Sequence, residues 1–101
     1  MNTTASLVQV SADLADLIPR YLENRRDDLA FARQLLASHD FYMLAGMAHR
    51  IRGSASSYGF NGLGDIAGAI EDAANRKDKQ AVETQLTALD HFLGSVEISY
   101  V

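Results

Sequence analysis

Apolar residues recur at spacings of three and four along most of the chain, which is the spacing of one face of an α-helix. These runs predict helices over about 19–37, 41–57 and 78–97, and one more that follows a glycine-rich segment and ends at Asn75. The apolar stripes are Ile18, Leu22, Leu29, Ala32 and Leu36; Phe41, Leu44, Ala48, Ile51 and Ala55; Leu63, Ile66, Ala67, Ile70 and Ala74; and Val82, Leu86, Leu89, Leu93 and Val96. No segment shows a sustained period of two, so the expected fold class is all-α.

Polar residues at the ends of these runs indicate where the helices begin. Pro19 suits a first helical turn, and Asp40 and Asp78 stand where side chains cap the helices that follow them. Residues 11–14 read as a short capped turn of helix across one end of the assembly, and 59–64 as a tight connection. Four amphipathic helices with short connections predict an antiparallel four-helix bundle with a short extra N-terminal helix.

Length and composition bound the possible functions. The 101 residues suffice for one domain, which is expected over 1–101. Of these residues 48% are hydrophobic and 22% are charged, a composition typical of an ordinary globular protein. The absence of cysteine excludes disulfides, thiolate metal sites and cysteine nucleophiles. A net charge of −4 argues against a nucleic-acid or anionic-membrane partner. Neither a spanning segment nor a secretory leader is evident, so a cytoplasmic location is expected.

The predicted helix over 41–57 carries a histidine on its polar side. On a helical wheel His49 points away from the apolar stripe, and Gly53 lies inside the helix, where glycine costs about 1 kcal/mol relative to alanine. The residues that share the His49 face are Ala45, Gly46, Arg52, Gly53 and Ser56. Small side chains therefore surround an exposed imidazole, although a solvated surface histidine with Gly53 in close helix packing is the ordinary structural alternative.

The charge around His49 points to an anion. Between residues 41 and 64 the only formal charges are Arg50 and Arg52, in a chain that is acidic overall. Arg52, three residues after His49, reaches the same face, and its planar guanidinium matches the oxygens of a phosphate. Ser56, two turns from His49, adds a hydroxyl.

The run AHRIRGS at 48–54 resembles the His-x-x-Lys-Gly-Ser motif of the histidine-containing phosphotransfer (HPt) domain family, with Arg52 where the family usually has lysine. Tyr58-Gly59-Phe60 resembles the turn after the family's phosphorylated helix, and Ile70-Glu71 the acidic close of its next helix. Residues 17–26 are similar to the opening helix of bacterial members. The resemblance covers essentially the whole chain and implies the same four-helix fold.

The resemblance implies a phosphorelay intermediate in two-component signalling rather than an enzyme. His49 would accept a phosphoryl group from a receiver-domain aspartate and pass it to another receiver. Arg52 would be the cation that holds the phosphate, and Gly53 would leave space for the partner beside His49. The expected partners are receiver domains of response regulators or hybrid histidine kinases. We expect no cofactor and no ATP site in this chain, because magnesium would be bound by the receiver, and we expect a monomer.

Other interpretations stay open at this point. The chain could be an HPt-like adaptor that binds a receiver or another regulatory protein without being phosphorylated, or a bundle with an unrelated scaffolding role. A metal site built from His39, His49 and His91 is disfavoured, because three distant helix positions would have to converge. Around His49, Tyr42, Met43, Met47 and Tyr58 are expected at the margin of the core, with one or two of them forming an apolar collar for a partner.

Overall fold

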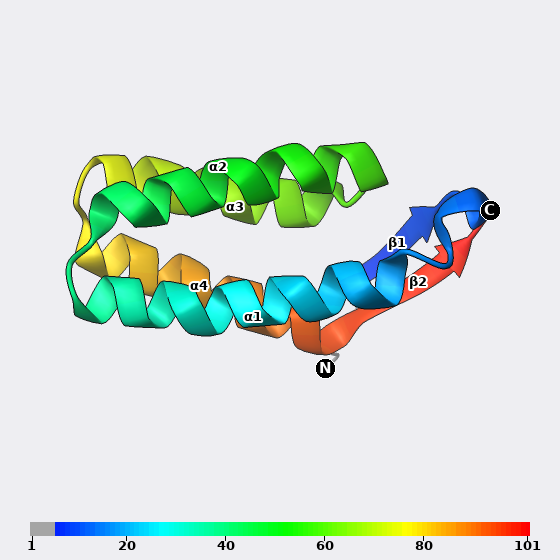
Figure 1. The fold of residues 1–101 in the computed structure, drawn as a ribbon, viewed down its shortest axis with the longest axis horizontal. Helices are drawn as coiled ribbons and strands as arrows, with labels where there is room; N and C mark the ends of the chain where they lie inside the picture. The colour runs from blue at the N-terminus through cyan, green and yellow to red at the C-terminus, as the bar shows by residue number, and fades with distance from the viewer. Residues whose placement is uncertain (1–5) are drawn as a thin grey trace.

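Four long helices make up most of residues 6–101, the part of the chain that the computed structural model describes (Figure 1). The elements in chain order are β1 Ser6–Val10, the 3-10 helix η1 Ala12–Leu14, α1 Ile18–Ala37, α2 Phe41–Tyr58, α3 Asn61–Asn75, α4 Lys79–Ser95 and β2 Val96–Tyr100. None of the helices in this range combines the length and the apolar character that a membrane crossing requires.

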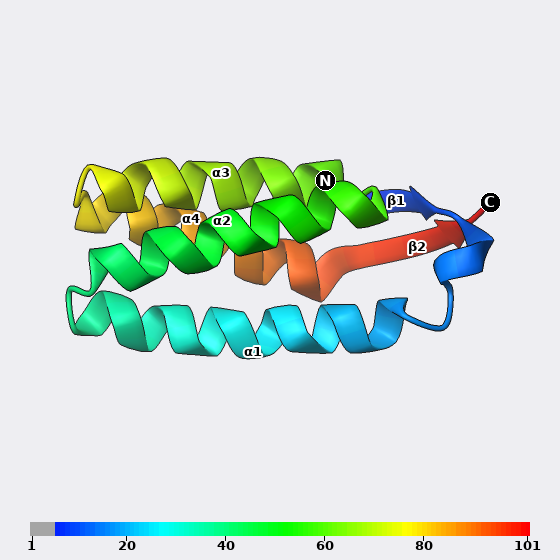
Figure 2. The same cartoon turned by 45° about the horizontal axis from the view of Figure 1, so that its top comes forward.

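The helices form an antiparallel bundle of two layers. α2 lies beside α3 in one layer and α1 beside α4 in the other, and the two strands extend from the end opposite the α1–α2 and α3–α4 connections (Figures 1 and 2). α2 and α3 share the most extensive interface. The predicted four-helix bundle is confirmed, as is the short turn of helix that follows Ser11.

Side-chain caps begin the helices where the sequence predicted them. Asp40 Oδ1 accepts a hydrogen bond from the Met43 amide at 3.1 Å, and Asp78 Oδ1 accepts one from the Ala81 amide at 3.1 Å. Each cap satisfies one of the amides that the first helical turn leaves without a partner. These two carboxylates therefore fix the starts of α2 and α4.

The predicted apolar stripes meet between the layers. Each helix contributes residues that are almost fully buried, among them Ile18, Leu44, Leu63 and Leu86, each at most 1% exposed. Removal of this apolar surface from water is the main favourable term for a bundle that has no disulfide. The outward faces of the helices are thereby fixed as well, because a helix that buries one stripe exposes the opposite one.

One polar cluster joins α1 to α2. Ser54 Oγ donates to the Ile51 carbonyl at 3.0 Å, lies 2.9 Å from the Tyr21 hydroxyl and accepts from Arg25 Nη1 at 3.4 Å. The Arg25 guanidinium also stacks over the Tyr21 ring at 4.6 Å. Its Nε lies 2.8 Å from Asp28 Oδ2, close enough for an ion pair but not aligned as a hydrogen bond. Arg25, the one polar interruption of the first stripe, thus packs inside the α1–α2 junction.

A short strand pair that the sequence did not indicate accompanies the all-α bundle. β1 and β2 pair in parallel, with Ser6 opposite Val96 and Val10 opposite Tyr100, and the last helix ends at Ser95 instead of 97. Val96 continues the spacing of the α4 stripe but is the first residue of β2. A five-residue strand is too short to give a clear period, and this pair forms only because the bundle brings the two ends of the chain together.

The connection before α3 is also shorter than predicted. Gly59 has the left-handed conformation, with φ of 85°, and its amide bonds to the carbonyls of Ala55 and Ser56 to end α2. α3 then begins at Asn61, so Gly62 and Gly64 are helical residues. Gly64 faces α2, where an added Cβ would stand 3.8 Å from the Cβ of Ala55. The glycines of this segment therefore serve a helix end and a close helix contact, not a loop.

Candidate functional site

His49 lies on the outer face of α2. Its neighbours Ala48 and Ile51 are 1% and 5% exposed on the inner face, so burial of that stripe turns the imidazole outward, and its side chain is 71% exposed. No large side chain covers the ring. The ring can therefore be reached by a second molecule.

Glu71 of α3 holds one nitrogen of this ring. Its Oε2 lies 3.1 Å from His49 Nδ1, and only 18% of the Glu71 side chain is exposed. A carboxylate can only accept a hydrogen bond, so Nδ1 is the ring nitrogen that donates in this contact. In the neutral imidazole this tautomer leaves the lone pair on Nε2.

Arg52 reaches across to the same carboxylate. Its Nη1 lies 3.4 Å from Glu71 Oε1, and its chain crosses α3 at Gly68, where an added Cβ would stand 3.7 Å from Arg52 Cδ. The two oxygens of the Glu71 carboxylate therefore contact different residues: Oε2 contacts His49, and Oε1 contacts Arg52. This role of Glu71 was not predicted from the sequence, in which Ile70-Glu71 only resembles the acidic end of a family helix. The one available signal was its position next to Ile70, a core residue of the neighbouring helix.

Gly53 is surrounded by open space. In the described range 6–101, no atom outside its own helical turn lies within 4 Å of where a Cβ would stand. Close helix packing is thereby excluded as the reason for this glycine, in contrast to Gly64 on α3. Gly53 lies one turn after His49, so a large side chain there would project beside the ring.

Ser56 lies farther along the same face. With Arg52, Asn61 and Asp65 it lines an open hollow of about 260 Å³ at the start of α3. The structure thus brings His49, Arg52 and Glu71 into direct contact, whereas Ser56 joins Arg52 only as a neighbour in this second hollow. The roles predicted for His49, Arg52, Gly53 and Ser56 remain predictions.

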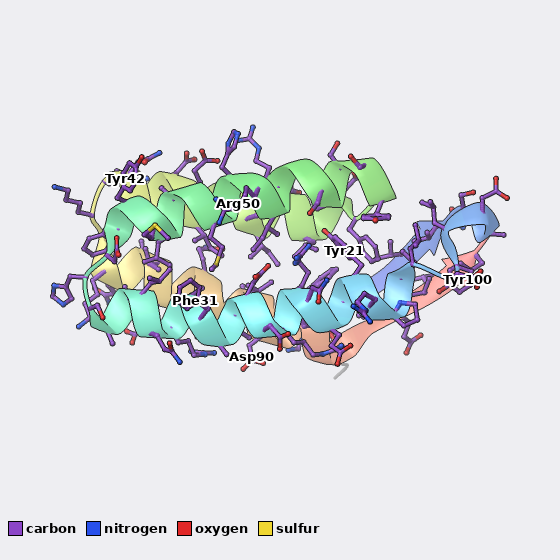
Figure 3. The ribbon with its side chains drawn as sticks, in the orientation of Figure 1. Tyr21, Phe31, Tyr42, Arg50, Asp90 and Tyr100 are labelled. Atoms are coloured by element: carbon purple, nitrogen blue, oxygen red, sulfur yellow. The ribbon has the colours of Figure 1, made fainter. Side chains whose placement is uncertain are left out.

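A larger open hollow of about 530 Å³ lies beside His49 toward the start of α2, lined among others by Tyr42, Met43, Gly46 and Arg50. Tyr42 is 88% and Met43 42% exposed, and both line the same hollow as His49. Figure 3 shows Tyr42 near the start of α2. Of the other two residues expected at the core margin, Met47 is buried, and Tyr58 packs against Tyr21 with ring centroids 4.5 Å apart. An apolar collar of Tyr42 and Met43 for a partner stays a prediction.

The other two histidines stand apart from this site. His39 follows α1 in a turn with a positive φ of 56°, its ring 6.0 Å from that of Phe41, and His91 is an exposed residue of α4. Among residues 6–101 no three histidine, aspartate or glutamate side chains are grouped so as to hold a metal ion.

Comparison with known proteins gives one match. The family model described as the Hpt domain matches residues 16–97, a range that contains all four long helices and His49. No curated protein and no solved structure matches the chain significantly. The matched range leaves out β1 and most of β2, so the strand pair is an addition to the part of the chain that the family model describes.

Proposed function

The chain belongs to the Hpt domain family, and on that premise we propose that it carries phosphoryl groups between receiver domains, with His49 as the phosphorylated residue. Hpt domains are phosphocarriers rather than enzymes and interact with receiver domains, so the chain takes part in two-component phosphorelay. The observation that carries the finer proposal is an exposed imidazole whose Nδ1 is held by Glu71 while Nε2 is free.

Nε2 is the nucleophile of the proposed transfer. Its lone pair attacks the phosphorus of a receiver's aspartyl phosphate, the Nε2–P bond forms, and the P–O bond breaks, so that the aspartate carboxylate leaves with the bonding electrons. No proton has to move, because Nδ1 keeps its hydrogen bond to Glu71 Oε2. The ring gains positive charge during this step, and the adjacent carboxylate stabilises that charge. The reverse sequence delivers the phosphoryl group to the next receiver.

The surroundings of the ring suit a transient partner. Gly53 leaves space one turn beyond His49, and the exposed Tyr42 and Met43 offer apolar surface on the other side. A receiver that contacts only these residues buries a small area and can leave after each transfer. We expect the magnesium ion and the acidic pocket that phosphoryl transfer needs to be supplied by the receiver.

The proposal is tested by following phosphate label from a panel of phosphorylated receivers of the same organism to the purified protein. The wild-type chain is expected to take up acid-labile label from at least one receiver, and His49→Gln to take up none. Since His49 is exposed, circular dichroism should show an unchanged helical content and melting temperature for this variant. His91→Gln, which removes another exposed histidine from a different helix, should label at the wild-type rate.

Two outcomes would contradict the proposal. Label retained by His49→Gln would place the phosphoryl group on another residue. A wild-type protein that binds a receiver in pull-down but never acquires label would instead be an adaptor of the same fold.

A further inference from the structure

We propose that Arg50, and not Arg52, is the cation that contacts the phosphoryl group while His49 is being phosphorylated. This inference rests on the function proposed above and assigns to the two arginines beside His49 two different tasks. Arg52 holds Glu71, which holds the imidazole, whereas the guanidinium of Arg50 is free to bind the incoming anion.

Arg52 is already engaged with Glu71. Its Nη1 lies 3.4 Å from Glu71 Oε1, and its chain rests on α3 at Gly68. To meet a phosphoryl group on Nε2, Arg52 would have to leave this carboxylate, and Glu71 would then lose one of the contacts that orient it toward His49. Arg52 is therefore better suited as a positioning residue.

The Arg50 guanidinium lies near the face of α2 that carries His49. Successive residues are rotated by about 100° around the helix axis. Viewed down this axis, Gly46 therefore lies between His49 and Arg50, and along the axis it lies about one turn before them. An added Cβ at Gly46 would stand 3.6 Å from Arg50 Nη1, so the guanidinium folds back along α2 over the glycine. Figure 3 places Arg50 about midway along α2, with Tyr42 nearer the start of the helix. The charge of Arg50 thus lies beside the His49 side of the helix.

The carboxylates near Arg50 are bound by other residues. Asp28, which lines another hollow together with Arg50, pairs with Arg25 at 2.8 Å. His49, Gly46 and Arg50 line the same hollow of about 530 Å³, and the carboxylate that also lines it, Glu71, is bound by His49 and Arg52. Among residues 6–101 no carboxylate lies within ion-pair distance of Arg50. An exposed arginine without a partner, next to a nucleophile, is available for the oxygens of a phosphoryl group.

The chemistry requires such a cation on this chain. During the step in which Nε2–P forms and the donor P–O bond breaks, negative charge is spread over the phosphoryl oxygens. The planar guanidinium can donate two N–H groups to these oxygens without giving up a proton. Arg50 would thereby stabilise the transferring group while Glu71 holds Nδ1 of the ring.

The test compares labelling of Arg50→Gln and Arg52→Gln by two donors. One donor is a phosphorylated receiver that labels the wild-type chain, and the other is phosphoramidate, a small donor with no protein surface. Because loss of one charge-assisted contact to the phosphoryl group acts on the transfer itself, Arg50→Gln should lower the rate about tenfold with both donors. Arg52→Gln should lower it less, and Arg20→Gln, an exposed arginine of α1, should stay within about twofold of wild type.

A second variant tests the same contact without removing the charge. Gly46→Leu should displace the guanidinium and reproduce the loss with phosphoramidate, and adding Arg50→Gln to it should cause no further loss. Gly46→Ala, whose Cβ fits at 3.6 Å, should label normally. Leucine and alanine both favour the helix, so these variants should remain folded.

Each other outcome has a distinct meaning. An Arg50→Gln rate within twofold of wild type with both donors, or a larger loss in Arg52→Gln with phosphoramidate, overturns the inference. A loss confined to the receiver also overturns it, because Arg50 would then contact the partner and not the phosphoryl group. Absence of His49 labelling in the wild-type chain with every donor would instead refute the proposed function.

Discussion

The inner face of α2 carries Leu44, Ile51 and Ala55, each at most 5% exposed, whereas the outer face carries His49 between Gly46 and Gly53. Side chains from the other helices fill the space next to the inner face, while nothing lies within 4 Å of a Cβ built at Gly53. Both faces include small residues, but Ala55 brings two helices together and Gly53 leaves a surface free. A small residue in a helix thus indicates either close packing or clearance, and only its surroundings decide which.

Substitutions on the two faces of α2 should affect different properties, namely the stability of the bundle and the rate of phosphoryl transfer. A filled inner face stabilises the bundle, so changes there should act on unfolding. The open outer face contributes little to stability, and a glycine within it costs about 1 kcal/mol relative to alanine. Changes on that face should therefore act on transfer.

Ile51→Ala should have the largest effect on folding. Ile51 is 5% exposed and lies two residues from His49, so its truncation leaves a cavity between the helix layers. The free energy of unfolding should fall by about 3 kcal/mol, as measured by urea denaturation. Labelling of His49 by phosphoramidate in the folded protein should remain near the wild-type rate. A stable variant with slow labelling would show that the two faces of α2 are not independent.

Gly53→Leu should slow phosphoryl transfer from a receiver without lowering the free energy of unfolding. Among residues 6–101, nothing lies within 4 Å of a Cβ built at this position, and leucine favours the helix more than glycine does, so the free energy of unfolding should be unchanged or slightly higher. The side chain would project beside His49 and obstruct a docking receiver, so transfer from a phosphorylated receiver should slow by about tenfold or more, or about 1.4 kcal/mol.

The control for this prediction is the same position with a smaller residue. Gly53→Ala should keep the transfer rate within about twofold of wild type, and phosphoramidate should label all three proteins equally. Normal transfer by Gly53→Leu would refute clearance as the purpose of this glycine.

Glu71→Ala should have the smallest effect. Without Oε2 opposite Nδ1, the proton of the neutral imidazole can move to Nε2, and a part of the molecules loses the nucleophilic lone pair. Labelling by phosphoramidate should slow about threefold, since a mixture of two tautomers retains much of the activity. The decisive measurement is the nitrogen spectrum of His49 by NMR, which should change from the Nδ1–H tautomer to a mixture, and Glu71→Asp should restore part of the original signal. An unchanged tautomer would show that Glu71 does not orient the ring.

The parts of the fold that depend on near neighbours in the chain could be predicted from the sequence. Periodic apolar residues, the caps Asp40 and Asp78, and the exposure of His49 each follow from spacings within a single helix. The strand pair could not be predicted in this way, because β1 and β2 are separated by nearly the whole chain and their pairing depends on how the bundle places its ends.

The candidate site likewise has features that follow from the local sequence and features that depend on how the helices pack. The sequence alone determined that the chain folds as four amphipathic helices and that one of them presents His49, small residues and Arg52 on its outer face, since the rotation per residue fixes which residues share a face. Only the tertiary structure decided that Glu71 meets His49, that Arg52 crosses to α3 while Arg50 folds over Gly46, and that Gly53 faces open space. These relations depend on the distance and rotation between packed helices, and long-range packing sets both, whereas the local pattern of the chain does not.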